Sequence, residues 1–186
     1  MRVLIACEYS GIVREEFKKN GHDAWSCDIL PTEIEGQHYQ CDVREILNQD
    51  WDLMIAHPPC THLATSGARW FKDKVNEQKE ALAFVQLLMD APIHKIAIEN
   101  PVSIISSRIR KPDQIIQPWM FGEQFQKTTC LWLKNLPKLI PTNIVDKGEF
   151  VIHGGKKIAK WYSNRELKRD KTFVGIANAM AAQWGI

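Results

Sequence analysis

The 186-residue sequence lacks any long run of apolar residues. A helix needs about 20 consecutive apolar residues to cross a bilayer, and every run in this chain is far shorter. Met1-Arg2 leads directly into a short strand pattern, so a cleaved secretory signal is not expected either. We therefore expect a soluble, cytoplasmic protein with no membrane partner.

The cysteines of the chain are not spaced as in a disulfide framework or a metal site. The five cysteines lie far apart and form no C-x-x-C pair; they are Cys7, Cys27, Cys41, Cys60 and Cys130. An odd number at such spacing favours reduced thiols. A zinc nucleobase deaminase needs an upstream H-x-E and a second cysteine three residues after the first, and neither accompanies Cys60. No metal is therefore expected.

Internal repeats and low-complexity tracts are also absent. With 45% hydrophobic residues, the chain can bury one core but is too short for two full domains, so we expect a single domain over residues 1–186 with a basic insertion around 134–171. The net charge of +2 hides two opposite halves: residues 1–107 hold 10 basic and 16 acidic side chains, and residues 108–171 hold 14 and 6. A basic half favours a polyanionic partner such as nucleic acid, although a solvated loop region has the same composition.

Short apolar runs alternate with helical patterns through the first half of the chain. The strand patterns cover residues 2–6, 24–27, 37–41, 52–56 and 95–98. Helical patterns cover residues 11–20 and the stretch around Ala81 to Met89. Helices that connect successive strands make right-handed crossovers, so the alternation predicts an α/β fold with a mostly parallel sheet.

The second half of the chain has a different pattern. Two further strands are predicted at residues 115–121 and 128–133, followed by a loop with one hairpin over residues 137–171. A final apolar helix, from Phe173 to Trp184, is expected to pack back on the sheet.

Polar side chains stand at the ends of four predicted strands. These side chains are Asp28, Asp42, Cys60 and Glu99. Because open parallel sheets bind ligands outside the carboxyl ends of their strands, we expect the four residues to line one edge.

Cys60 and Glu99 together suit one reaction on a pyrimidine ring. A thiolate can add to C6 of cytosine and make C5 nucleophilic, while an acid hydrogen-bonds ring N3. The acid must be protonated for part of the cycle, so we expect partial burial to raise the pKa of Glu99. Pro59 would stiffen the turn that presents the thiol, and Asn100 would bind substrate or fix its own turn. A buried structural thiol and a helix-capping carboxylate are the alternatives for Cys60 and Glu99.

Pro58-Pro59-Cys60 after one strand and Glu99-Asn100 after the next resemble motifs of the cytosine-C5 DNA methyltransferase family. Residues 174–179 look like that family's closing Gly-Asn-Ala motif. Residues 122–126 look like the family segment in which a Gly and a Gln precede two arginines. The motifs stand in the family's order, and the likeness is to compact, phage-type members. It implies a class I S-adenosylmethionine (SAM)-dependent methyltransferase, with a Rossmann-like sheet covered by helices on both faces, in the cytoplasm of a bacterial or phage-infected cell.

The resemblance also implies roles for individual residues. SAM would bind at the ends of the first three strands, and the base at the ends of the next two. Cys60, Glu99, Asn100 and Pro59 would form the catalytic group. Asp28 would bind the ribose hydroxyls of SAM, Asp42 would lie near its adenine amino group, and Asn178 would close the cofactor site. Pro58 is another implied cofactor-binding residue. The family's first, Gly-rich motif, which lies around the methionine moiety of SAM, would be replaced here by Ala6, Cys7, Glu8, Ser10 and Gly11.

The chain departs from the family pattern at several positions. The first motif lacks its usual glycine pair near Glu8. The family's Gln, Val and two arginines are replaced here by Thr61, Pro101, Thr128 and Cys130. The region between Cys130 and Lys171 is too short for the family's target-recognition domain, so low sequence specificity is implied.

DNA, duplex or single-stranded, is the implied partner. Basic side chains near aromatic ones combine phosphate attraction with stacking on bases; the candidates here are Arg69, Lys156, Lys157, Lys160, Trp161 and Arg165. A Trp161 ring that packs on the domain fits the sequence equally well. To reach C5 in a duplex, the enzyme would flip the base out of the helix.

Three alternatives stay open. The acceptor could be a free cytosine nucleotide or RNA, because the basic half would serve a polymer or a single phosphate. The chain could be an amino-group (N4 or N6) DNA methyltransferase, since Ala56-His57-Pro58-Pro59 resembles the segment that grips an exocyclic amine in that class. The departures in the motifs also permit a non-catalytic methyltransferase-like module that binds DNA.

Overall fold

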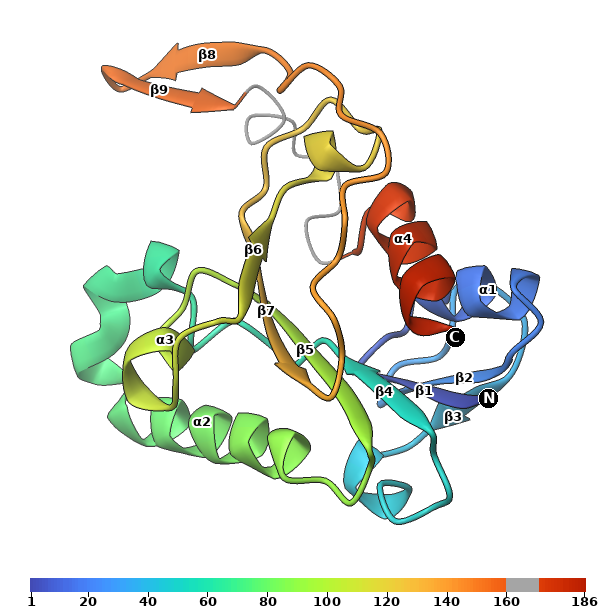
Figure 1. Ribbon diagram of the computed structural model, residues 1–186. Coiled ribbons are helices and arrows are strands. Elements are labelled where there is room, and N and C mark those ends of the chain that lie inside the picture. Colours follow the sequence, from blue (N-terminus) through green and yellow to red (C-terminus); the bar gives the residue numbers. More distant parts are fainter. Residues whose placement is uncertain (160–170) are drawn as a thin grey trace.

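One seven-stranded sheet organises the protein (Figure 1). The computed structural model describes residues 1–159 and 171–186. The strand order across the sheet is β3-β2-β1-β4-β5-β7-β6. The strands are β1 (Arg2–Ala6), β2 (Asp23–Asp28), β3 (His38–Gln40), β4 (Leu53–Ala56), β5 (Lys95–Pro101), β6 (Gln114–Ile116) and β7 (Thr129–Lys134). β1 to β5 are parallel, and β7 runs antiparallel to both of its neighbours.

Helices cover both faces of this sheet. α1 (Ile12–Lys19) and α4 (Val174–Trp184) lie side by side on one face, whereas α2 (Val75–Met89) and α3 (Ile105–Arg108) lie on the other (Figure 1). The described part of the chain also contains three 3-10 helices: η1 (Val43–Glu45), η2 (Thr65–Asp73) and η3 (Pro118–Met120). The expected mostly parallel α/β sheet with two covered faces is confirmed.

Apolar residues alternate between two cores because successive strand side chains point to opposite faces. In β1, Val3 and Ile5 pack with α1 and α4, whereas Leu4 and Ala6 pack on the side of α2. All four are fully buried. Burial of both sheet faces explains why the central strands have near-continuous apolar sequences.

The register brings the carboxyl ends of the central strands level with one another. Ala6 pairs with Cys27 on one side and with Ala56 on the other, and Ala56 pairs with Ile98. The residues that follow these four positions therefore emerge in one row at the same edge of the sheet.

The second half of the chain differs from its predicted pattern at one place. The single strand predicted over residues 115–121 is wrong: β6 ends at Ile116, and η3 follows. Pro118 explains the break, because it has no N–H for a ladder hydrogen bond and its fixed φ suits the start of a helical turn. The predicted hairpin is confirmed as β8 (Phe150–His153) and β9 (Lys156–Ala159), which extend away from the sheet in Figure 1.

Among the described residues, no helix is both long and apolar enough to cross a membrane.

Candidate functional site

A cavity of about 680 Å³ opens at the carboxyl edge of the parallel strands. Its walls come from the carboxyl ends of β2 and β5, from the segments that follow β1, β2, β3 and β4, and from η1, α2 and the segment before β7. Eight of the residues singled out from the sequence line it: Cys7, Asp28, Asp42, Pro58, Pro59, Cys60, Glu99 and Asn100. Residues far apart in the chain thus meet in one space, as the strand-end argument predicted.

Cys60 is presented to solvent at one side of this cavity. Its carbonyl accepts the amides of Leu63 at 3.0 Å and Ala64 at 2.9 Å, so Cys60 begins a tight turn after the two prolines. Its exposure argues against the alternative that the thiol is a buried packing residue.

Asn100 ties the Cys60 loop to β5. It is 1% exposed, and its Nδ2 donates to the Pro58 carbonyl at 2.8 Å. Its Oδ1 is buried and receives no hydrogen bond from the described residues. This hydrogen bond fixes the Cys60 loop and not the turn next to Asn100 itself, so it differs from the structural role expected from the sequence.

Glu99 lies beside Asn100, and its side chain is 14% exposed. Its Oε2 is 3.1 Å from Nδ1 of His57. Burial pushes the pKa of Glu99 upward, but the hydrogen bond and charge of His57 and the charge of Lys127 outweigh burial and hold that pKa below its ordinary value. The expected raised pKa of Glu99 is therefore wrong for the free protein, because two cationic partners compensate the desolvation.

Sequence reasoning missed both of these partners. His57 directly follows β4, within the Ala56-His57-Pro58-Pro59 segment, so its place at the strand end was a usable signal. Lys127 precedes β7 and reaches the cavity because β7 pairs antiparallel with β5. Its Nζ donates to the Lys171 carbonyl at 3.3 Å. No local pattern in the sequence marks Lys127.

The other half of the cavity carries two carboxylates and a strained residue. Oδ1 of Asp28 accepts the Leu30 amide at 3.0 Å. Asp42 caps η1, and hydrogen bonds from Arg44 lower the pKa of this carboxyl. Cys7 has φ 58°, a left-handed conformation that is uncommon for a residue with a side chain. Burial, with the charges of Asp28 and Asp42, raises the pKa of the Cys7 thiol to about 12.

This half offers the hydrogen-bond acceptors and the apolar surface that suit an adenosine-containing cofactor. Carboxylates accept hydrogen bonds from ribose hydroxyls and from an exocyclic amine, and apolar side chains contact the ring. Ile29 and Leu30 supply apolar surface beside Asp28. The cavity volume also lies in the range of about 300–1,000 Å³ that is usual for small-molecule sites. No group of three or more His, Cys, Asp or Glu among the described residues could hold a metal ion.

Several residues of the implied first motif lie behind the cavity wall instead of lining it. Glu8 is 5% exposed, and its carboxylate accepts the α1 amides of Val13 at 2.7 Å and Arg14 at 3.3 Å. Ser10 donates its hydroxyl to Glu8 at 3.1 Å. Neither Glu8 nor Ser10 lines the cavity, and their side chains hold the start of α1. The expected direct contact of these side chains with the cofactor is therefore corrected to a supporting role.

Three further cofactor-binding predictions do not fall on the cavity. Ala6 is fully buried in β1. Gly11 has φ 76°, and a Cβ on it would lie 2.8 Å from Nη2 of Arg14, so a glycine is required for packing. Asn178 donates to Oε2 of Glu16 at 3.3 Å, in the contact between α4 and α1. The expectation that Asn178 closes the cofactor site is wrong in this structure, because its amide faces the neighbouring helix.

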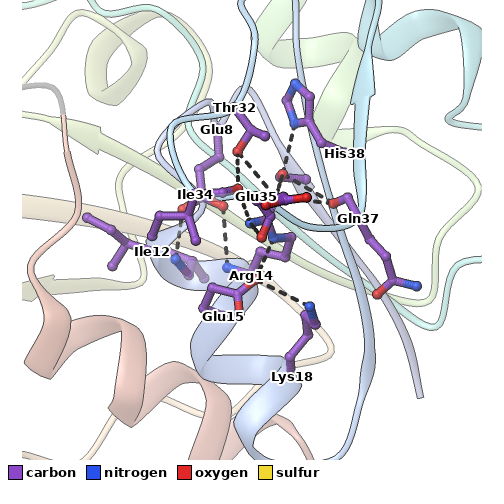
Figure 2. Close-up of polar contacts among 12 residues, drawn as sticks. Glu8, Ile12, Arg14, Glu15, Lys18, Thr32, Ile34, Glu35, Gln37 and His38 are labelled. Carbon is purple, nitrogen blue, oxygen red and sulfur yellow. Dashed lines mark hydrogen bonds and ion pairs between the residues drawn. The ribbon is translucent and has the colours of Figure 1, made fainter.

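Arg14 holds the loop that carries one cavity wall (Figure 2). Its side chain is fully buried, and it donates to Oγ of Ser26 at 3.0 Å and to the carbonyl of Ile34 at 2.6 Å. It also donates to Oε1 of Glu15 at 2.9 Å. The chain between β2 and β3 is thereby fastened to α1, and Ile29 and Leu30 at its start are fixed beside the cavity.

The predicted nucleic-acid-binding residues are only partly described. Arg69 is exposed in η2, which follows the Cys60 loop. Lys156 and Lys157 belong to strand β9, in the hairpin that extends from the sheet. Lys160, Trp161 and Arg165 lie outside the described residues.

No protein-family model matches the sequence, and no curated protein matches it either. Among solved structures, the chain is similar to a protein of E. coli described as a candidate DNA modification methyltransferase encoded within a prophage. The TM-score is 0.51 at 16% sequence identity, and the match covers 77% of this chain and 51% of the other. The chain therefore spans about half the length of that protein. The strand order and this likeness together show the Rossmann-like class I methyltransferase fold.

Proposed function

We propose that this chain is a SAM-dependent DNA methyltransferase that transfers a methyl group to cytosine C5 with low sequence specificity. One observation carries the proposal: an exposed thiol, the mostly buried Glu99 carboxylate and two strand-end carboxylates line the same cavity. The first pair suits activation of a pyrimidine ring, and the second pair suits an adenosine moiety.

Cys60, Glu99 and Asn100 would each have a different role in the reaction. The Cys60 thiolate would form a bond to C6 of the ring, which turns C5 into a nucleophile. Glu99 would hold ring N3 through a hydrogen bond. Asn100 would fix the position of the Cys60 loop relative to Glu99, because its side chain donates a hydrogen bond to the Pro58 carbonyl. Asp28 and Asp42 would hold SAM, whose chemistry when bound would be to donate its electrophilic methyl group to C5 and leave as S-adenosylhomocysteine. The C5 proton is then lost to water as the thiolate leaves C6.

DNA is the proposed acceptor for two reasons. Residues 108–171 carry the excess of basic side chains, and phosphate contacts of Lys and Arg provide most non-specific nucleic-acid affinity. The structural neighbour is also described as acting in DNA modification. The region between Cys130 and Lys171 is short, so we expect few base-specific contacts.

Methyl transfer from radiolabelled SAM tests the proposal directly. Duplex DNA, single-stranded DNA, RNA and dCMP would be offered side by side, and the methylated nucleoside would be identified by mass spectrometry. We expect 5-methylcytosine in DNA, and we expect Cys60→Ser to abolish its formation. Cys130→Ala is the matched control, because the Cys130 thiol is 2% exposed and lies outside the cavity lining.

Each of the other possible results of this assay would favour one of the alternative functions. N4-methylcytosine or N6-methyladenine, with activity retained in Cys60→Ser, would favour amino-group transfer and leave Cys60 a bystander. Transfer to dCMP or RNA alone would replace DNA as the acceptor. DNA binding without SAM binding would favour a non-catalytic module.

A further inference from the structure

Two free thiols are in contact in the cofactor half, the part of the cavity beside Asp28 and Asp42. Sγ of Cys27 lies 3.9 Å from Sγ of Cys41, and both residues line the cavity. Each cysteine directly precedes one of the two carboxylates, because Asp28 follows Cys27 and Asp42 follows Cys41. The proposed methyl transfer gives neither of these thiols a role.

The sheet register explains why the two sulfurs meet. Cys27 of β2 pairs with Tyr39 of β3, and Cys41 lies two residues after Tyr39. Residues two apart in an extended chain point to the same face, and both cysteines pack into the core on the side of α2. The Cys27 thiol also donates to the Cys41 carbonyl at 3.5 Å.

The two cysteines differ in how firmly they are held. Cys27 is fully buried, pairs with strands on both sides, and accepts the Glu8 amide on its carbonyl at 3.1 Å. Burial, together with the charge of a neighbouring Cys41 thiolate, raises the pKa of Cys27. Cys41 is partly exposed and lies beyond the last residue of β3. A small oxidant in the cavity would therefore react at Cys41, and Cys41 is the residue that would move.

A bond between the two sulfurs would alter the cofactor half. Sulfurs in a disulfide lie about 2.0 Å apart, so they would have to approach by about 2 Å. Because Cys27 is fixed in the sheet, this displacement falls on Cys41 and on Asp42, which caps η1. A hydrogen bond to a ligand does not survive a displacement of that size.

We propose that Cys27 and Cys41 form a redox-sensitive pair, and that their disulfide lowers the affinity of this site for SAM. The inference rests on the proposed function, because it takes Asp42 as a contact of the cofactor. The oxidant is a hydroperoxide, of which hydrogen peroxide is the simplest case.

The oxidation balances with two thiols and one hydrogen peroxide. A sulfur lone pair of Cys41 forms a bond to one peroxide oxygen, the O–O bond breaks, and the departing hydroxide takes the Cys41 proton as water. The Cys27 sulfur then forms a bond to the sulfur of the Cys41 sulfenic acid. The S–O bond breaks, and the departing hydroxide takes the Cys27 proton as a second water. The two thiols lose two electrons, and the peroxide gains two.

Peptide mapping tests the pair without any cofactor. The full-length protein would be treated with hydrogen peroxide, its remaining thiols would be blocked with iodoacetamide, and an unreduced digest would be examined by mass spectrometry. We expect the Cys27 peptide to be joined to the Cys41 peptide in wild type and unjoined in Cys41→Ser. Cys130→Ala is the matched control and should form the same disulfide, because Cys130 lies outside the cavity lining. Thiols of Cys27 and Cys41 that both stay free, or that join other cysteines, would overturn the inference.

Calorimetry of SAM binding tests the consequence, with each protein compared with itself before and after peroxide. We expect wild type to lose at least about tenfold in affinity and to recover it with dithiothreitol, since a charge-assisted hydrogen bond is lost. Cys41→Ser should bind SAM equally before and after treatment. Cys60→Ser should respond as wild type does, which would exclude oxidation of the exposed Cys60 thiol as the cause. A disulfide that leaves the affinity unchanged, or a loss that persists in Cys41→Ser, would contradict the proposal.

Thermodynamic linkage gives a second measure of the same coupling. If the disulfide weakens SAM binding tenfold, saturating SAM must disfavour the disulfide by the same factor. We therefore expect SAM to raise the reduction potential of the pair by about 30 mV in glutathione buffers. An equal potential with and without SAM would sink the proposed coupling. If the reduced wild type binds no SAM, the proposed function fails together with the effect on affinity, while peptide mapping still decides whether Cys27 and Cys41 are a redox pair.

Discussion

Replacement of Arg14 by alanine should destabilise the protein strongly, because this residue is a fully buried cation with several acceptors. Three of its hydrogen bonds are well formed: to Glu15 at 2.9 Å, Ser26 at 3.0 Å and Ile34 at 2.6 Å. If each contributes about 1–1.5 kcal/mol, Arg14→Ala should lower the free energy of unfolding by about 3–4.5 kcal/mol. Arg14→Lys keeps the charge but loses the planar fork of donors, so an intermediate loss is expected.

Urea denaturation followed by tryptophan fluorescence measures this loss by linear extrapolation. Lys18→Ala is the matched control, since Lys18 lies on the same helix and contacts the same Glu15 carboxylate at 3.5 Å. As a part-exposed ion pair, it should change stability by less than about 1 kcal/mol. Because Ile29 and Leu30 line the cavity, the affinity for SAM should also fall in Arg14→Ala and stay unchanged in Lys18→Ala.

The opposite result would be an Arg14→Ala protein whose free energy of unfolding lies within about 1 kcal/mol of wild type, with an unchanged slope against urea concentration. It would mean that the loop between β2 and β3 keeps its conformation without the guanidinium. The same result would remove the link between α1 and the cavity wall.

Three further changes have definite expected outcomes. Gly175→Ala should lower the melting temperature although alanine favours helices, because the new Cβ would lie 2.0 Å from the Phe121 carbonyl oxygen, and such overpacking costs about 1–3 kcal/mol. Glu99→Gln should gain stability relative to wild type as pH falls from 5 to 3 in urea titrations. The folded-state pKa of Glu99 is lowered, so its ionised form stabilises the protein above about 4.3, its unfolded value, and that contribution is lost on acidification. Asp28→Ala should weaken SAM binding at least about tenfold by calorimetry, because a carboxylate on two vicinal hydroxyls makes charge-assisted hydrogen bonds.

Each of these outcomes has a clear opposite. A higher melting temperature for Gly175→Ala would contradict the close approach of α4 to Phe121; Gly67→Ala, where a Cβ meets nothing within 4 Å, is the control. A constant stability difference between wild type and Glu99→Gln from pH 5 to 3 would contradict the lowered pKa. Unchanged SAM affinity in Asp28→Ala would place the cofactor elsewhere, and Asp23→Ala, at the opposite end of β2, controls for folding.

The sheet could be predicted from sequence because its signals are local. Apolar runs such as Leu53–Ala56 are long enough only for a buried strand, and the polar residue after each run marks the functional edge. The meeting of Asp28, Cys60 and Glu99 at one cavity follows from parallel strands that end level with one another.

The parts that could not be predicted depend on tertiary contacts. Lys127 reaches Glu99 only because β7 inserts antiparallel beside β5, and no sequence pattern announces this reversal. The pKa of Glu99 was expected to rise because burial alone was considered, without its two cationic partners. Glu8 and Asn178 look like ligand-binding residues by position, yet one caps a helix and the other bridges two helices.

Covalent catalysis by Cys60 is tested most directly by identifying the residue that becomes joined to a trapped base. DNA with 5-fluorocytosine would be incubated with the protein and SAM, the denaturation-resistant product would be digested, and the peptide joined to the base would be sequenced by mass spectrometry. We expect a methylated fluorocytosine linked to the sulfur of Cys60, and no such product from Cys60→Ser. Methylated DNA without any covalent product, or a base linked to a different residue, would contradict it.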